Sequence, residues 1–238
     1  MVRSARYLTV AAAIALPLFA ASCGSRREAA PDFPATGLDH ILVGAPDLDA
    51  AVASVARQTG VRPTPGGSHP GVGTRNALLS LGSGAYLEII APDPAQKSGD
   101  FGKFVASLKS MTPLGWALHT DDIDRLHSAL AARGVRVEPI VSGSRVRPDG
   151  RTLRWRNFEI GPEEDVSPFF IQWDRGSPHP STDAPKGCHV EQLVRGGGTM
   201  KPNAVKALQL VGQAAVLHST APDGLHFTLG CLGGSMRF

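Results

Sequence analysis

A strand-to-helix pattern that occurs twice constrains this chain more than any other feature. The two copies, 38–48 and 114–123, are apolar runs that each end at an aspartate able to cap a helix. Asp47 and Asp122 hold these positions, and a glycine follows each expected helix. A repeat of this size predicts two stacked copies of one βα-type unit, with any ligand between them.

Hydrophobic periodicity extends each copy into a longer module. The first module is predicted to contain strand 38–45, helix 47–60, loop 63–73 and a hairpin of 76–81 and 85–91. A helix over 101–108 connects it to the second module. The second reads as strand 114–120, helix 123–133, strand 135–140, and a hairpin of 151–161 and 168–174. Strand 188–194, helix 203–211 and two strands around 222–224 follow. The predicted fold class is α+β: two tandem βαβββ modules form a curved sheet around a cleft, and a partial βαββ unit ends the chain.

The first 22 residues are interpreted as an export signal. Arg3 and Arg6 precede an apolar stretch that is too short for a comfortable membrane span. The stretch ends at Cys23, and small residues before a cysteine resemble the lipobox of bacterial lipoproteins. The expectation is an exported, membrane-anchored lipoprotein facing the periplasm. An ordinary secreted protein or an uncleaved anchor are the alternatives.

The expected organisation follows from these boundaries. A signal peptide spans 1–22, a lipidated N-terminus and tether 23–36, module one 37–112, module two 113–180 and the partial module 187–238. Without Arg3 and Arg6, the chain has 22 basic and 21 acidic side chains, so its charge gives no reason to expect nucleic acid as a partner. The membrane is expected as a partner through the N-terminal lipid.

Two cysteines remain when Cys23 is reserved for lipid. Cys188 and Cys231 both lie in apolar, strand-like surroundings near the C-terminus. An even number of cysteines in an oxidising compartment favours a disulfide between them. Two buried thiols are the alternative.

Several motifs together resemble a known family. They are Asp39-His40 on the first strand, GGSHPGVGTRN over 66–76, YLEIIAPDP over 86–94, GWAL over 115–118, and PDG at 148–150 followed by LRW at 153–155. This set is similar to the glyoxalase-like domains of the vicinal oxygen chelate superfamily. The resemblance covers residues 37–176, with a looser fit afterwards.

The resemblance implies a divalent metal ion between the modules, held by one residue from the first and one from the last strand of each. Those positions are His40, Glu88, Gly115 and Gln172 in this chain. Glycine offers no side chain, so a metal here has His40, Glu88 and Gln172 as its candidate ligands. Water or substrate would complete its coordination.

Other residues are candidates for contact with a small-molecule ligand. His69 and Asn76 lie in and beside the glycine-rich segment, where functional residues are common. Arg75 and Arg154 would suit an anionic substrate, and Gln172 would orient a ligand. For each there is a structural alternative, such as a turn for the glycine-rich segment or a water-facing charge for the arginines.

Two functions from different classes remain open. The first is an enzyme of the lyase or isomerase type, in which Glu88 takes a proton next to a carbonyl and His40, with or without a metal, polarises the substrate oxygen. The missing ligand at Gly115 argues against glyoxalase I activity. The second is a non-catalytic lipoprotein that sequesters a small molecule in the same cleft. A single chain supplies both modules, so neither function requires an oligomer.

Overall fold

The computed structural model describes residues 33–161, 168–196, 201–218 and 221–238. Cys23, the predicted signal peptide and most of the predicted tether lie outside these residues. Phe33–Phe238 forms one compact unit. No helix in the described part of the chain is both long and apolar enough to cross a membrane.

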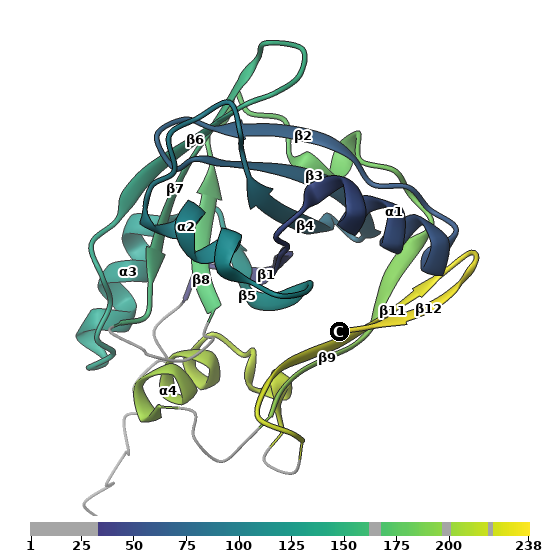
Figure 1. Ribbon diagram of the computed structural model, residues 1–238. Coiled ribbons are helices and arrows are strands. Elements are labelled where there is room, and N and C mark those ends of the chain that lie inside the picture. The colour runs from purple at the N-terminus through teal and green to yellow at the C-terminus, as the bar shows by residue number, and fades with distance from the viewer. Residues whose placement is uncertain (1–32, 162–167, 197–200, 219–220) are drawn as a thin grey trace, which may run out of the picture. The chain divides into compact units, whose positions relative to one another are not determined.

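In the part of the chain that the structure describes, eight strands form a closed barrel in the order β1-β4-β3-β2-β6-β7-β8-β5 (Figure 1). The strands are β1 Thr36–Gly44, β2 Thr64–His69, β3 Thr74–Gly82, β4 Ala85–Pro92, β5 Thr112–Thr120, β6 Val141–Val146, β7 Thr152–Glu159 and β8 Pro168–Trp173. The barrel helices are α1 Leu48–Thr59, α2 Asp100–Ser107 and α3 Ile123–Ala132. The predicted α+β class with two βαβββ modules is confirmed, and the predicted curved sheet closes on itself.

Helix α1 begins and ends where the sequence predicts. The Asp47 carboxylate accepts hydrogen bonds from the backbone amides of Asp49 and Ala50, which satisfies donors that the first turn leaves free. Gly60 ends the helix in the left-handed conformation, with φ of 72°. Asp122 caps α3 in the same way by accepting from the Arg125 amide. The two caps give both modules the same strand-to-helix geometry.

The hydrophobic core lies between the barrel wall and the helices, because alternate residues of a strand point to opposite faces. On β4, Leu87 and Ile89 are fully buried on the helix side, while Tyr86 and Glu88 face the barrel interior. Each such aliphatic side chain contributes about 1.5–3 kcal/mol when buried. The outer face of each strand therefore supplies stability, and the inner face is available for a site.

Two predictions for the linking segments are wrong. The segment 63–73 contains strand β2 rather than a loop, and β2 pairs with β6 where Ser68 lies opposite Val146. Gly67, with φ of 135°, makes this approach possible, because any Cβ there would collide with the Val146 carbonyl oxygen. The predicted strand 135–140 is reduced to a bridge between Val137 and Ile160, and β6 begins at Val141 instead.

The C-terminal unit adds a second sheet in the order β10-β9-β11-β12. Its elements are β9 Cys188–Gly196, α4 Pro202–Leu210, β10 Leu217–His218, β11 Gly224–Cys231 and β12 Gly234–Arg237, and short 3-10 helices span Pro180–Thr182 and Ala214–Val216. The chain order of these elements, one strand, one helix and three strands, is that of the two modules, although β9 lies inside its sheet rather than at one edge of a β1-β4-β3-β2 type order. The strand β12 is one more than the predicted βαββ unit contains. The predicted partial third module is therefore present in a slightly longer form.

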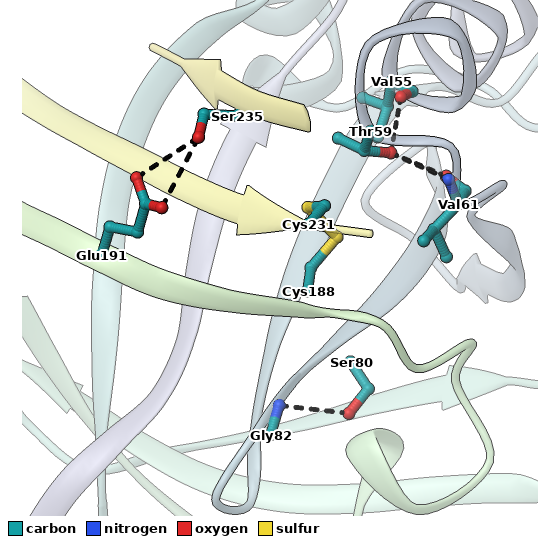
Figure 2. Close-up of a disulfide and its surroundings, with 9 residues drawn as sticks. All are labelled: Val55, Thr59, Val61, Ser80, Gly82, Cys188, Glu191, Cys231 and Ser235. Carbon is teal, nitrogen blue, oxygen red and sulfur yellow. Dashed lines mark hydrogen bonds between the residues drawn. A yellow bond between two sulfur atoms is a disulfide. The ribbon is translucent and has the colours of Figure 1, made fainter. Parts of the chain in front are cut away.

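A disulfide joins the two long strands of this second sheet. Cys188 begins β9 and lies opposite Cys231 at the end of β11, with the two sulfur atoms 2.03 Å apart (Figure 2). Nearby, the Gly233 amide donates to the Thr59 carbonyl at 2.9 Å, which connects the β11–β12 turn to the end of α1. The disulfide therefore lies next to the contact between the C-terminal sheet and module one.

Candidate active site

A cavity of about 200 Å³ inside the barrel contains the buried ionisable groups. Its walls combine aromatic and aliphatic side chains with two histidines, a glutamate and an arginine. Two larger hollows, of about 490 and 740 Å³, lie elsewhere and are lined mainly by loop and outward-facing residues. The smaller cavity is the candidate site, because buried ionisable groups that share a cavity are typical of functional sites.

Strand alternation brings His40 and Glu88 into this cavity. Strands β1 and β4 run parallel, and Leu42 lies opposite Glu88 in their register. His40, Leu42 and Glu88 all line the cavity, whereas Ile41 and Ile89 pack into the outer core. The family-like positions on the first and last strand of module one therefore meet in space.

The Glu88 carboxylate is the centre of a buried polar cluster. The Asn76 amide donates to one carboxylate oxygen at 2.6 Å, and His69 Nε2 lies 3.5 Å from the same oxygen. His40 Nε2 lies 3.6 Å from the other oxygen. Burial raises the pKa of Glu88, but attraction to Arg145 and to His40 and His69 in their charged forms, together with the Asn76 hydrogen bond, outweighs burial and leaves this pKa below its usual value. Glu88 is therefore ionised at neutral pH and can accept a proton.

The His40 ring is positioned by its sequence neighbour Asp39, which contacts the ring nitrogen that faces away from Glu88. The Asp39 carboxylate lies 2.7 Å from His40 Nδ1, and its other oxygen accepts from Trp173 Nε1 at 3.1 Å and faces His179 Nε2 at 3.1 Å. Burial raises the pKa of Asp39, but the hydrogen bonds with His179 and His40 outweigh burial and hold this pKa well below its usual value. Because an ionised carboxylate can only accept, the proton on the His40 ring lies on Nδ1 and Nε2 faces Glu88.

Two further rings, those of His69 and Tyr86, contribute to the polar part of the cavity. His69 Nδ1 lies 2.9 Å from the Thr74 hydroxyl, and burial lowers the pKa of His69 below its ordinary value. Tyr86 stacks on His40 with ring centroids 4.7 Å apart. Burial, together with the charges of Glu88 and Asp39, raises the pKa of Tyr86 well above its ordinary value, so the phenol keeps its proton. Both rings therefore stay neutral at neutral pH.

Three predicted site residues do not join this cluster. The Gln172 amide bonds the Asp121 carbonyl, the Ile123 amide and Arg156 near the start of α3, outside the cavity. Arg75 lies 3.5 Å from Asp49 in the hollow beside α1. Arg154 is exposed on β7. Each faces away because it lies one strand position from a cavity residue, and a shift of one residue changes the face of the sheet.

The four metal-ligand positions that the resemblance implied are not assembled in this chain. His40 and Glu88 meet, Gln172 is bonded elsewhere, and Gly115 has no side chain. Among the described residues, no group of three or more His, Cys, Asp and Glu side chains is arranged to hold a metal ion. The residues present therefore do not fit the predicted metal, and the chemistry is derived from the side chains.

Sequence reasoning did not find Arg145, Asp39 as a partner of His40, or His179. Arg145 lines the cavity from β6, a strand that lies outside the predicted segments. The alternation of Ser142, Ser144 and Val146 with Gly143 and Arg145 was the available signal for this strand, and it is weak because both faces look polar. His179 lies in the connection between β8 and β9, where no periodicity exists to place it.

Comparisons with known proteins agree with this architecture. Residues 38–209 match the family model described as a glyoxalase-like domain. A hypothetical protein from Staphylococcus aureus has a similar structure, with a TM-score of 0.58, 17% identity, and 85% of each chain covered. Methylmalonyl-CoA epimerase from Mycobacterium tuberculosis is 24% identical over 57% of this chain and 86% of its own, with a TM-score of 0.44. No curated protein sequence matches this chain.

The family match spans both modules and reaches α4 of the C-terminal unit, and it includes every residue of the cavity cluster. The Staphylococcus aureus structure supports the same fold. The chain belongs to the glyoxalase-like domain family.

Proposed function

We propose that this protein is an enzyme of the lyase or isomerase type, which removes a proton from carbon next to the carbonyl of a small molecule bound in the barrel cavity. The observation that carries this proposal is the ionised Glu88 carboxylate, buried in the cavity between His40 and His69. A buried base beside a second proton carrier is the arrangement that general acid–base catalysis requires.

Glu88 is the proposed base. Its carboxylate takes the proton, and the electron pair of the broken C–H bond forms the C=C bond of an enolate, whose negative charge lies on the former carbonyl oxygen. Asn76 holds one oxygen of Glu88, which leaves the other oxygen, on the His40 side, free for the substrate. Return of the proton from Glu88 to a neighbouring carbon on the same face gives an isomer.

His40 is the proposed partner of the substrate oxygen. Asp39 fixes its ring through Nδ1, so Nε2 is the atom presented to the cavity. Nε2 donates when it carries a second proton and accepts when the ring is neutral. His40 can therefore pass a proton to the enolate oxygen and take it back, while Asp39 keeps the ring in position.

The direct test is deuterium exchange without net reaction. A panel of small ketones, 2-oxo acids and thioesters in D₂O is incubated with the full protein, and loss of the proton signal next to each carbonyl is followed by NMR. We expect the wild type to accelerate exchange of at least one class, and Glu88→Gln to lose this acceleration by 10²-fold or more. Glu159→Gln, a change at an exposed glutamate on β7, is the matched control and keeps full activity.

A non-catalytic binding protein is the second candidate. The apolar lining of the cavity, including Trp155 and Phe169, favours it because such walls bind small ligands without chemistry. Tight binding of a panel compound that Glu88→Gln retains, with no exchange of any class by the wild type, would support this function and overturn the enzyme proposal.

We also propose that the chain is exported and anchored to the membrane through a lipid on Cys23. The sequence before Cys23 supports this, and the disulfide between Cys188 and Cys231 is consistent with an oxidising compartment. Mass spectrometry of the N-terminal peptide is expected to show a diacylglyceryl cysteine at position 23. Cys23→Ser should release the protein from the membrane fraction, whereas an unmodified N-terminus at another position would contradict the anchor.

A further inference from the structure

Arg145 on β6 places a guanidinium group inside the barrel. Its side chain lines the cavity, and only 2% of the residue's surface is exposed to solvent. Removing a charged group from water is costly unless a partner of opposite charge or a set of hydrogen-bond acceptors compensates for it. A buried arginine therefore requires an explanation from its surroundings.

The surroundings of Arg145 do not supply such a partner. Its Nε is buried without a hydrogen bond, and no described carboxylate or carbonyl forms a hydrogen bond or ion pair with its guanidinium. The neighbouring arginines differ. Arg147 pairs with Asp183, and Arg156 holds both oxygens of Asp124 at 3.1 and 2.9 Å. The Glu88 carboxylate interacts electrostatically with Arg145 but lies beyond ion-pair distance from it. Glu88 also accepts a hydrogen bond from Asn76.

The absence of a side chain at Gly66 makes room for the Arg145 guanidinium and the Asn76 amide. A Cβ at Gly66 would collide with Asn76 Oδ1 and would lie 2.9 Å from Arg145 Nη1. Asn76 Oδ1 is itself buried and has no hydrogen-bond partner in the described part of the chain. An unpartnered donor group and an unpartnered acceptor therefore lie together over the same glycine, at the Glu88 side of the cavity.

Away from its polar groups, the cavity wall is apolar over much of its area. Leu42, Ile90, Phe169 and Trp155 contribute hydrocarbon surface, and His69 packs edge-on against Trp155 with ring centroids 6.4 Å apart. The volume of about 200 Å³ is below the roughly 300–1,000 Å³ typical of pockets for drug-sized ligands. The cavity therefore fits a small molecule with one polar end and a compact apolar body.

We propose that Arg145 binds the carboxylate of a small 2-oxo acid, or of a similar carboxylate with an adjacent carbonyl, whose apolar body lies against Trp155 and Phe169. The planar guanidinium matches a carboxylate through two parallel hydrogen bonds, which an ammonium group cannot reproduce. This arrangement puts the carbonyl group within the space bordered by His40 and Glu88. The assignment rests on the proposed function for the reaction, but its binding part requires no turnover.

The test compares two ligands that differ at one group. 2-Oxo-4-phenylbutanoate and 4-phenylbutan-2-one share the phenyl body and the ketone, and a methyl group replaces the carboxylate in the second. Binding to the full protein is measured by calorimetry and by the fluorescence of the cavity tryptophans. We expect the carboxylate to bind at least tenfold more tightly than the neutral ketone, and Arg145→Gln to remove this difference while binding of the ketone is retained.

Three further variants separate the proposal from its alternatives. Arg145→Lys, which keeps the charge but not the planar fork, should recover only part of the preference. Arg154→Gln removes an exposed arginine from the adjacent strand and should change nothing. Glu88→Gln should retain or strengthen carboxylate binding, because a nearby negative charge is removed, even though it abolishes exchange. Retained binding without exchange in the wild type would therefore overturn the proposed function and leave the ligand assignment standing.

A purely structural role for Arg145, as counter-charge to Glu88, gives a different result. In that case the two ligands bind equally to the wild type, and Arg145→Gln weakens both or lowers the melting temperature without changing their ratio. Ketone binding by Arg145→Gln also reports that the variant is folded. Equal affinities of the wild type for the acid and the ketone would overturn the proposal.

Discussion

The Asp39 carboxylate lies 2.7 Å from Nδ1 of His40, although neighbouring side chains on a strand normally point to opposite faces of the sheet. The pairing of β1 with β5 explains this contact. Leu38 lies opposite Leu118 and His40 opposite Ala117, so Asp39 is an extra residue that has no partner on β5. Such a bulge re-aims a side chain, and here it turns Asp39 toward the ring of His40.

The first prediction concerns the charge of Asp39. Asp39→Asn keeps the shape of the side chain but replaces one acceptor oxygen by a donor, which then faces His40 or the donors from Trp173 and His179. Because hydrogen bonds to a buried charged group contribute about 1.5–3 kcal/mol each, we expect a loss of about 2–4 kcal/mol in unfolding free energy. Urea unfolding measures it. Asp122→Asn, at an exposed helix cap that accepts asparagine, should change stability by less than about 0.5 kcal/mol. Equal effects of the two changes would contradict a special role for Asp39.

The second prediction concerns the closure of the barrel. Gly67→Ala should destabilise the protein by more than about 3 kcal/mol, because the new methyl group must displace β6 at its contact with β2. Gly71→Ala is the matched control. Gly71 also has a positive φ, of 78°, but a Cβ there meets nothing within 4 Å. Gly71→Ala therefore reports the cost of backbone strain alone, about 1–2 kcal/mol. If the two variants unfold at the same urea concentration, the close approach of β2 and β6 is not what requires Gly67.

Local signals in the sequence were sufficient for the modules but not for the complete site. Asp47 and Gly60 bound α1 through caps that operate within one turn, so the sequence alone locates that helix. The family resemblance is what pairs His40 with Glu88, and the parallel register of β1 and β4 places both side chains in the cavity. Arg75 and Gln172 lie outside the cavity because each is one residue from a position that faces it.

The remaining features depend on contacts between distant segments. The Asp39 bulge is visible only in the register of β1 against β5, and His179 reaches Asp39 from 140 residues away. The strand β2 runs through a segment rich in proline and glycine, which predicts a loop by composition. The segment is nevertheless a strand, because its backbone pairs with β3 on one side and with β6 on the other. Tertiary pairing overrides local propensity at each of these places.

The third prediction concerns the disulfide in the C-terminal sheet. Cys188 and Cys231 are 43 residues apart, and closing a loop of this length removes about 4 kcal/mol of chain entropy from the unfolded state. The double variant Cys188→Ala, Cys231→Ala should therefore lose about 2–4 kcal/mol of unfolding free energy. The wild type should lose a similar amount in the presence of reductant, and the double variant should not respond to reductant. If the unfolding free energy of the wild type does not change with reductant, although mass spectrometry shows that both cysteines are reduced, this prediction is contradicted.

The fourth prediction concerns metal content. The donor set that the resemblance implied is broken at Gly115 and Gln172, so His40 and Glu88 would be left to hold a divalent ion. We expect the purified protein to retain much less than one equivalent of metal by elemental mass spectrometry, even after incubation with zinc or manganese and desalting. Proton exchange by the wild type should survive chelation. Retention of a stoichiometric metal that both His40→Ala and Glu88→Ala lose would instead restore the metal-assisted reaction.

The last prediction concerns acid sensitivity. Burial lowers the pKa of His69 below its ordinary value of 6.5, so at a pH between the two values the unfolded chain binds a proton that the folded protein does not. Stability then rises with pH across this window and is lost as the pH falls below about 6.5. One such proton gives a slope of at most about 1.4 kcal/mol per pH unit. Unfolding free energies measured by urea at pH 7.5, 6.5 and 5.5 should show this loss.

Two matched variants identify which histidine causes the loss of stability at low pH. His69→Asn retains a polar atom near the Thr74 hydroxyl but cannot titrate. The slope of its unfolding free energy against pH should therefore be smaller than that of the wild type, by at most the slope that one proton gives. His119→Asn removes an exposed histidine on β5 and should keep the wild-type slope. The sign of the effect is the decisive observation, because a histidine stabilised in its charged form by Glu88 would make the protein more stable as the pH falls. Parallel curves for the wild type and His69→Asn would show that neither effect operates at His69.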